Sequence, residues 1–212
     1  MKPLCVGIYG ETCAGKSTLG KRLSLTMSCP YISFGDMKRQ EIAMGSEMGL
    51  SIKKLLAQGF SLPAELSCAV IRSAIANGLN LISGYPISDD ELKMFSAHVS
   101  MVGILTLKVD EPTLIQRFNL RRECPQCHLP GTINDICPNH HIQMVKREDV
   151  RLDELLARRK LYQQRIEPFL NSKLVEALPR LSLDSGVLTK SDIASQAEQW
   201  VRELIAGKQG EV

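Results

Sequence analysis

The stretch "GETCAGKST" (residues 10–18) decides the fold, because its first eight residues match G-x-x-x-x-G-K-[ST] at every position. An apolar run with β-branched members, "LCVGIY" (4–9), precedes it, and a segment with helical spacing of leucines (15–28) follows it. Glycines let successive backbone N–H groups point at a phosphate, and the start of the next helix adds positive charge. We therefore predict a strand–loop–helix unit that binds the phosphates of a nucleotide.

Two side chains in this loop are of the types that phosphoryl transfer requires. We expect the Lys16 ammonium to reach the β- and γ-phosphates of ATP and the Ser17 hydroxyl to ligate Mg²⁺. A chance glycine-rich turn is the alternative, but it would not explain the strand before and the helix after the motif. The loop alone does not choose among motors, GTPases, transporters and small kinases. The residues predicted to bind the nucleotide are Gly10, Cys13, Ala14, Gly15, Lys16, Ser17 and Thr18.

Short apolar runs alternate with amphipathic segments along the rest of the chain. Buried strands are predicted at 79–84, 101–109 and 181–184, with a short strand or loop at 30–36. Strands that alternate with helices form a parallel sheet covered on both faces. The predicted fold class is therefore α/β, a phosphate-loop (P-loop) parallel five-stranded sheet flanked by helices.

Some helices carry explicit end signals. A helix is predicted at 62–78, because Pro63 suits its first turn and Asn77-Gly78 would stop it. Ser88 is the predicted N-cap of the next helix, and Glu91 is its capping-box partner. The charged segment 147–178 is predicted to be helical, with a bend or break before Pro168.

The composition is that of an ordinary globular protein: 44% of the 212 residues are hydrophobic, and the net charge is +3. So mild a charge indicates neither a nucleic-acid partner nor a membrane surface. No run approaches the roughly 20 apolar residues that span a bilayer. The chain does not begin like a signal peptide, and its seven cysteines are an odd number, so we expect reduced thiols and a cytoplasmic location.

Cysteine and histidine gather in "CPQCHLPGTINDICPNHH" (124–141), which contains a C-x-x-C pair and a C-x-x-H pair. Four such ligands fit tetrahedral Zn²⁺, and four filled positions predict a structural metal. So short a segment cannot bury a hydrophobic core of its own. A metal cross-link would supply the stability that the missing core does not. His141 is an alternative fourth ligand, His128 is a weaker one, and a chance cluster of thiols and imidazoles is the alternative to a metal site. The predicted ligands are Cys124, Cys127, Cys137 and His140.

Several stretches in collinear order resemble the adenylate kinase family, the nucleoside monophosphate kinases with a mobile lid. "ISFGDMKR" (32–39) is similar to the family's I-S-T-G-D-M-x-R, and "SLPAEL" (61–66) resembles its L-V-P-D-E. "LISGYP" (81–86) resembles L-x-D-G-F-P-R, and "IQRFNLRR" (115–122) resembles the D-R-x-x-x-R at the lid entrance. The C-P-Q-C that follows directly is similar to the zinc-carrying form of the lid. The order and spacing of these motifs carry the resemblance, not any one of them.

The resemblance implies transfer of the γ-phosphoryl group of ATP to a nucleoside monophosphate, with small-molecule nucleotides as the partners and a monomer as the default state. It also implies a P-loop core at 1–123 and 148–212, with an acceptor-binding helical segment at about 34–64. The segment 124–147 would be an inserted zinc-binding lid.

Arginines are implied to carry the catalysis, because the transferring phosphoryl group spreads negative charge over its oxygens. Arg117 resembles the arginine over the ATP base, and Arg121 the one that clamps the transferring group. Arg159, with Arg158 as an alternative, resembles the arginine that arrives on lid closure. The bland interpretation of Arg158 and Arg159 is a solvated, salt-bridged helix face.

The acceptor side departs from the family pattern. Ser83 replaces an aspartate, and Ile87 replaces the arginine that binds the acceptor phosphate. Glu91 falls near the glutamine that reads adenine, and Phe34 stands where a threonine faces the acceptor base. We therefore favour a nucleoside monophosphate without requiring AMP. The alternatives are a kinase for another small phosphorylated metabolite and a nucleotide-binding protein of low turnover. The residues predicted to bind the acceptor are Phe34, Asp36, Arg39, Gly84 and Glu91.

Overall fold

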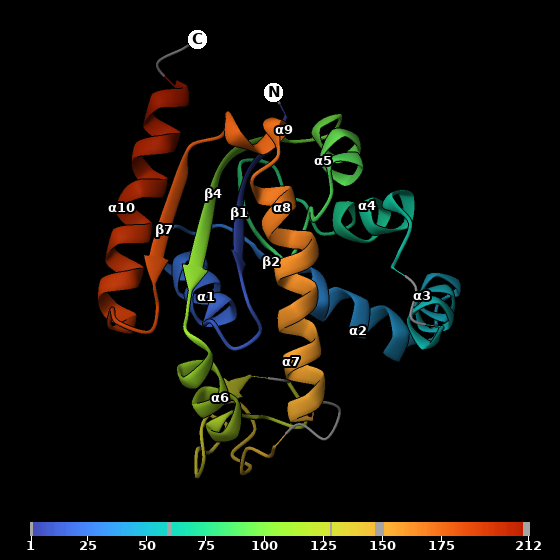
Figure 1. The fold of residues 1–212 in the computed structure, drawn as a ribbon, viewed down its shortest axis with the longest axis vertical. Coiled ribbons are helices and arrows are strands. Elements are labelled where there is room, and N and C mark those ends of the chain that lie inside the picture. Colours follow the sequence, from blue (N-terminus) through green and yellow to red (C-terminus); the bar gives the residue numbers. More distant parts are fainter. Residues whose placement is uncertain (1, 59–60, 128, 147–150, 210–212) are drawn as a thin grey trace.

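The fold is a five-stranded parallel sheet with helices on both faces, as the sequence predicts (Figure 1). The computed structural model describes residues 2–58, 61–127, 129–146 and 151–209. The strand order is β2-β3-β1-β4-β7, so β1 lies in the centre and the chain crosses it between β3 and β4. Open parallel sheets bind ligands outside the carboxyl ends of the strands at such a reversal of order. The strands are β1 (Leu4–Gly10), β2 (Tyr31–Ser33), β3 (Leu79–Ser83), β4 (Ser100–Lys108) and β7 (Arg180–Asp184).

Alternate residues of the central strand face opposite layers of helices, because side chains along a strand point to opposite faces. Val6 and Ile8 are fully buried in the layer formed by α1 (Lys16–Thr26) and α10 (Lys190–Gln209). Cys5, on the same strand, belongs to the core of the opposite face. Burial on both sides explains why the strand reads as a continuous apolar run.

The opposite face of the sheet carries the core formed with helices between residues 34 and 96. The core there is aromatic: Phe34, Tyr85 and Phe95 are all buried, and neighbouring ring centroids lie 5.3 Å and 5.1 Å apart. Pairs of tilted rings at this spacing add to the burial of apolar area. The helices are α2 (Phe34–Met44), α3 (Glu47–Ala57), α4 (Ala64–Arg72) and α5 (Asp89–Ser96).

The segment that contains the cysteine and histidine residues follows α6 (Glu111–Leu120) and extends beyond the carboxyl ends of the strands (Figure 1). It holds a two-stranded antiparallel pair, β5 (Arg122–Glu123) and β6 (Pro130–Gly131). After it, the chain returns past β1 through α7 (Leu152–Leu161) and further helical turns (Figure 1). Within the described ranges, no helix is long and apolar enough to cross a membrane.

The helix expected at 62–78 ends at Arg72, so that prediction is wrong over its last turns. The reason is a distant side chain. Asn80 is fully buried on β3, accepts a hydrogen bond from Ala76 N–H at 3.0 Å and donates one to Ala76 O at 2.8 Å. These bonds satisfy backbone groups that a continued helix would otherwise have paired.

Before Pro168, where a bend or break is predicted, the chain stays helical but changes its type of helix. The chain passes from α7 through a π-helical segment, η1 (Tyr162–Ile166), directly into α8 (Glu167–Leu170) and then α9 (Lys173–Glu176). Pro168 lies in the first turn of α8, where its missing N–H costs no α-helical bond. A widened turn thus accommodates the proline without a break.

Candidate active site

The loop between β1 and α1 has the backbone that its glycines predict. Gly10 has a φ of +145°, and a Cβ there would lie 2.6 Å from the Leu107 carbonyl oxygen on β4. Gly15 has a φ of +102° and precedes the first residue of α1. Only glycine fits both the backbone angle and the close approach at residue 10. The start of α1 consequently points its free N–H groups toward the loop.

The Lys16 side chain folds back into this loop. Its Nζ donates hydrogen bonds to the backbone oxygens of Gly10, at 2.6 Å, and Glu11, at 2.7 Å. Burial lowers the pKa of Lys16 from 10.5 to about 8. The ammonium is therefore held where a phosphate group in the loop would meet it, at the expense of its hydration.

Two serines contact the same tyrosine: Ser83 ends β3, and Ser17 lies in the first turn of α1. The Tyr31 hydroxyl lies 2.7 Å from Ser83 Oγ and donates to Ser17 Oγ at 3.4 Å. Tyr31 was not among the predicted site residues, although its place on β2, beside "ISFGD", was a usable signal. The result is a group of hydroxyl oxygens at the start of α1, of the hard type that Mg²⁺ prefers.

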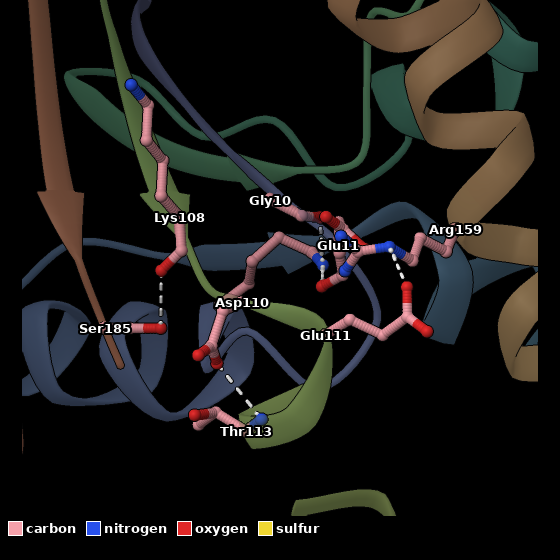
Figure 2. Close-up of polar contacts among 9 residues, drawn as sticks. Gly10, Glu11, Lys108, Asp110, Glu111, Thr113, Arg159 and Ser185 are labelled. Carbon is pink, nitrogen blue, oxygen red and sulfur yellow. Dashed lines mark hydrogen bonds and ion pairs between the residues drawn. The ribbon is translucent and has the colours of Figure 1, made fainter. Parts of the chain in front are cut away.

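Arg159 links α7 to the loop (Figure 2). Its Nη1 donates to Glu11 Oε2 at 2.9 Å, and its Nε lies 3.4 Å from Glu111 Oε2. The Glu11 side chain is only 10% exposed, and burial raises its pKa while the Arg159 charge opposes that rise. Sequence reasoning missed Glu11, although an acidic residue inside a phosphate-binding loop was a visible anomaly.

The other predicted arginines have separate positions. Arg117 donates to Ser185 Oγ at 3.0 Å and to the Ser185 carbonyl oxygen, and Ser185 Oγ in turn donates to Lys108 O at 3.0 Å. Figure 2 shows this serine beside the end of β4, close to Asp110, which caps α6. Arg121 Nη1 lies 4.0 Å from Cys13 Sγ in the loop.

Arg158, the alternative to Arg159, does not take part in the same contact. Its side chain is 46% exposed and lies 4.0 Å from Glu154 on the same helix. The structure therefore brings Lys16, Arg121 and Arg159 to the loop, and gives Arg158 the surface pairing that the bland interpretation expected.

On the acceptor side, Asp36 and Arg39 form an ion pair on α2, and Gly84 has a φ of +74°. Ser88 caps α5 as predicted, since its Oγ accepts from Glu91 N–H at 3.2 Å. The reciprocal half of the capping box does not form. Glu91 Oε2 accepts from Ile87 N–H at 2.8 Å instead, because the carboxylate turns inward from the helix start.

The cysteine and histidine cluster is assembled. The ligand atoms of Cys124, Cys127, Cys137 and His140 all lie within 4.8 Å of one another. His140 Nδ1 is 3.5 Å from Cys124 Sγ and 3.6 Å from Cys137 Sγ, and the Cys127 and Cys137 sulfurs are 3.6 Å apart. Ligands bonded at about 2.0–2.3 Å in a tetrahedron are about 3.3–3.8 Å apart, so these three separations fit zinc. His141 is exposed and outside this group, and His128 lies outside the described residues.

Comparison with known proteins identifies the family. The model of the family described as adenylate kinase matches residues 8–176. The chain is 30% identical over 189 residues to an adenylate kinase of Pseudothermotoga lettingae, with 80% of this chain and 84% of the relative covered. It is also 30% identical to an adenylate kinase of Thermococcus onnurineus, with 77% and 79% covered. The chain belongs to the adenylate kinase family.

Adenylate kinases are nucleoside monophosphate kinases that use ATP and Mg²⁺, so this chain is a phosphotransferase that binds nucleotides. In this member of the family, Glu11 places a carboxylate in the glycine loop, where it contacts Arg159.

Proposed function

We propose that the chain transfers the γ-phosphoryl group of ATP to a nucleoside monophosphate at the carboxyl end of β1. The convergence of Lys16, Arg121 and Arg159 on one glycine loop supports this assignment most directly. Three cations at one phosphate-binding loop exceed what binding alone requires, and they suit a transition state with spread negative charge. We assign Lys16, Arg121 and Arg159 the catalytic roles and leave Arg158 as a surface residue.

Each residue has a distinct task in the proposed mechanism. The loop N–H groups and Lys16 hold the β- and γ-phosphates, and Arg121 orients the transferring group from the far side of the loop. Ser17, with Ser83 and Tyr31 behind it, would hold Mg²⁺, which neutralises charge on the phosphate oxygens when bound. Arg117 and Ser185 would flank the ATP base at the ends of β4 and β7.

The Glu11–Arg159 ion pair must open for Arg159 to reach a phosphate. Glu11→Gln is expected to lower the KM for ATP about fivefold. The variant removes both a competitor for Arg159 and a repulsive charge, an effect of roughly 1 kcal/mol. Steady-state kinetics at pH 7 measure it.

Glu111→Gln is the matched control, because it removes the other carboxylate on the same guanidinium. Glu111 is 52% exposed, so its interaction is screened and the KM should change less than about twofold. A rise in the KM of Glu11→Gln would instead mean that Glu11 supports the loop.

The pKa of Lys16 predicts a pH dependence. Burial lowers this pKa to about 8, so the ammonium of the nucleotide-free enzyme loses its proton as pH rises through 8. Affinity for a non-hydrolysable ATP analogue should therefore be greatest below pH 8 and fall between pH 8 and 9.5. The affinity of the Lys16→Arg variant for the analogue should change little between pH 8 and 9.5, because a guanidinium stays charged. Wild-type affinity that is constant to pH 9.5 would contradict the role of Lys16.

We further propose that the four-ligand cluster binds one structural Zn²⁺ in a lid at 124–147, between core segments 1–123 and 148–212. The closed ligand set supports this role, since it leaves no position for a substrate. The acceptor-binding segment at about 34–64, a monomeric state, a cytoplasmic location and the lack of nucleic-acid or membrane partners complete the proposal. The free thiols of the cysteines are consistent with that location.

One assay tests the proposed function. Purified protein is incubated with Mg-ATP and each of the four common ribonucleoside monophosphates, and diphosphate formation is followed. Turnover with at least one of them is expected. Absence of turnover with all four would favour another phosphorylated acceptor or a binding protein of low turnover. Arg39 would hold the acceptor phosphate alone, because the Ile87 side chain cannot donate hydrogen bonds to it. We therefore expect a higher KM for the acceptor than for ATP.

A further inference from the structure

Glu91 is a buried carboxylate without a full set of partners. The residue is 5% exposed, and Oε2 accepts one hydrogen bond, from Ile87 N–H. Among the described residues, no cation lies within 4.0 Å of it, and burial raises its pKa. A carboxylate held in this way loses more hydration than one N–H group restores, and such groups gather at ligand sites.

A second polar group beside Glu91 is also incomplete. The Ser67 hydroxyl, on α4, is the one buried side-chain polar atom in the described ranges that lacks a hydrogen-bond partner; the residue is 1% exposed. It lies close enough to Glu91 to favour the charged form of that carboxyl, but not in a geometry that completes a bond. Buried hydroxyls are nearly always paired, so the unpaired Ser67 hydroxyl marks a place where a hydrogen-bond partner is missing.

A cation and two aromatic rings complete the group. Lys38 Nζ lies 4.5 Å from the centre of the Phe34 ring, and that ring is 5.3 Å from the Tyr85 ring. The Tyr85 hydroxyl donates to the Glu91 backbone oxygen at 3.5 Å, so Glu91 lies beside the same pair of rings. Burial lowers the pKa of Lys38, and the charge of Glu91 opposes this shift. The α2, α4 and α5 helices thus bring an ammonium, a hydroxyl and a carboxylate together beside an apolar wall.

We propose that these residues, the Glu91 cluster (Phe34, Lys38, Ser67 and Glu91), bind the base of the acceptor nucleotide and select guanine. The inference rests on the proposed function, because it takes a nucleoside monophosphate as the acceptor. Glu91 contacts the N1–H and N2–H donors, and Lys38 donates to O6. The hydroxyl of Ser67 supplies a further donor or acceptor at the same edge.

The hydrogen-bonding edges of the bases decide the choice. An ionised carboxylate only accepts hydrogen bonds, so it needs donors. Adenine and cytosine present an amino group next to a bare ring nitrogen, whose lone pair would face a carboxylate oxygen. Uracil presents one N–H between two carbonyls. Guanine alone presents two adjacent donors beside a carbonyl acceptor, and lysine is a common partner of that carbonyl.

The first test compares acceptors with wild-type protein and Mg-ATP. The kcat/KM for GMP should exceed that for AMP by about 100-fold, since a mismatched base leaves buried polar groups unpaired. Inosine monophosphate lacks the N2 amino group and should fall about tenfold below GMP. A kcat/KM for AMP equal to or above that for GMP would overturn the assignment.

The second test uses variants that keep the local fold. Glu91→Gln retains an oxygen for Ile87 N–H but adds a donor, so the GMP-to-AMP ratio should fall about 100-fold. Lys38→Met should lower kcat/KM for GMP about tenfold with little change for AMP. Lys93→Met, at an exposed lysine on α5, is the matched control and should leave both values unchanged. An unchanged GMP-to-AMP ratio in Glu91→Gln would overturn the proposal.

Calorimetric titration with GMP and AMP separates the two proposals. Tighter binding of GMP without turnover of any monophosphate would overturn the proposed function and retain the base assignment. Turnover of AMP with weaker binding of GMP would overturn the base assignment and retain the proposed function.

Discussion

Lys16→Ala is expected to lower kcat/KM for ATP at least about 1000-fold. The ammonium is held within the loop by Gly10 O and Glu11 O, and no other lysine contacts these oxygens among the described residues. Its loss removes a buried positive charge from the point where charge develops during transfer, and single donors at such points contribute factors of about 100 to 1000 or more. A coupled assay of ADP formation measures the effect.

The fold should survive this change. Lys16 lies at the first position of α1, and its hydrogen bonds are to the loop rather than to the core. Circular dichroism and metal content should therefore match those of wild type. Lys21→Ala on the same helix is the matched control and should retain activity within about twofold. Activity of Lys16→Ala near the wild-type level would overturn the assignment of the phosphate loop.

The second large effect concerns the metal site. His140→Asn is expected to weaken zinc binding by roughly 100-fold or more, because one of four ligands is lost from a site that contributes about 10–16 kcal/mol. The wild-type protein should contain about one zinc per chain, in keeping with one closed four-ligand set. Metal analysis after dialysis against a weak chelator measures both values.

His141→Asn is a demanding control, because it makes the same substitution one residue away. His141 has a φ of +54°, which asparagine tolerates well, and its ring is outside the ligand group. Zinc content should be unchanged in this variant. Loss of zinc from His141→Asn but not from His140→Asn would mean that His141 is the fourth ligand. Wild-type protein that folds without zinc would refute the metal site.

The loop and the sheet could be predicted because they depend on features close together in the sequence. A continuous apolar run makes a strand that is buried on both faces, and two glycines at fixed spacing make a phosphate-binding turn. The structure has β1 at Leu4–Gly10 and α1 from Lys16, which agrees with the prediction. The C-x-x-C pair and the C-x-x-H pair are likewise local motifs, and their four ligand atoms lie within 4.8 Å of one another.

The side-chain contacts of the candidate site join residues far apart in the sequence. Glu11 meets Arg159 across 148 positions, and Arg117 meets Ser185 across 68. Asn80 ends a helix that local signals would have continued. Hydrophobic periodicity and motif spacing do not predict these side-chain contacts, because the contacts depend on the order of the strands in the sheet.

The sequence by itself determined that a glycine-rich loop lies at the end of the first strand and that a cluster of three cysteines and one histidine follows the double arginine. Both come from short motifs whose backbone geometry is local. Only the tertiary structure decided that Arg159 rather than Arg158 reaches the loop, and that the Glu91 carboxylate turns inward to accept from Ile87 N–H. A side chain's partner is fixed by packing, and packing is a property of the whole fold.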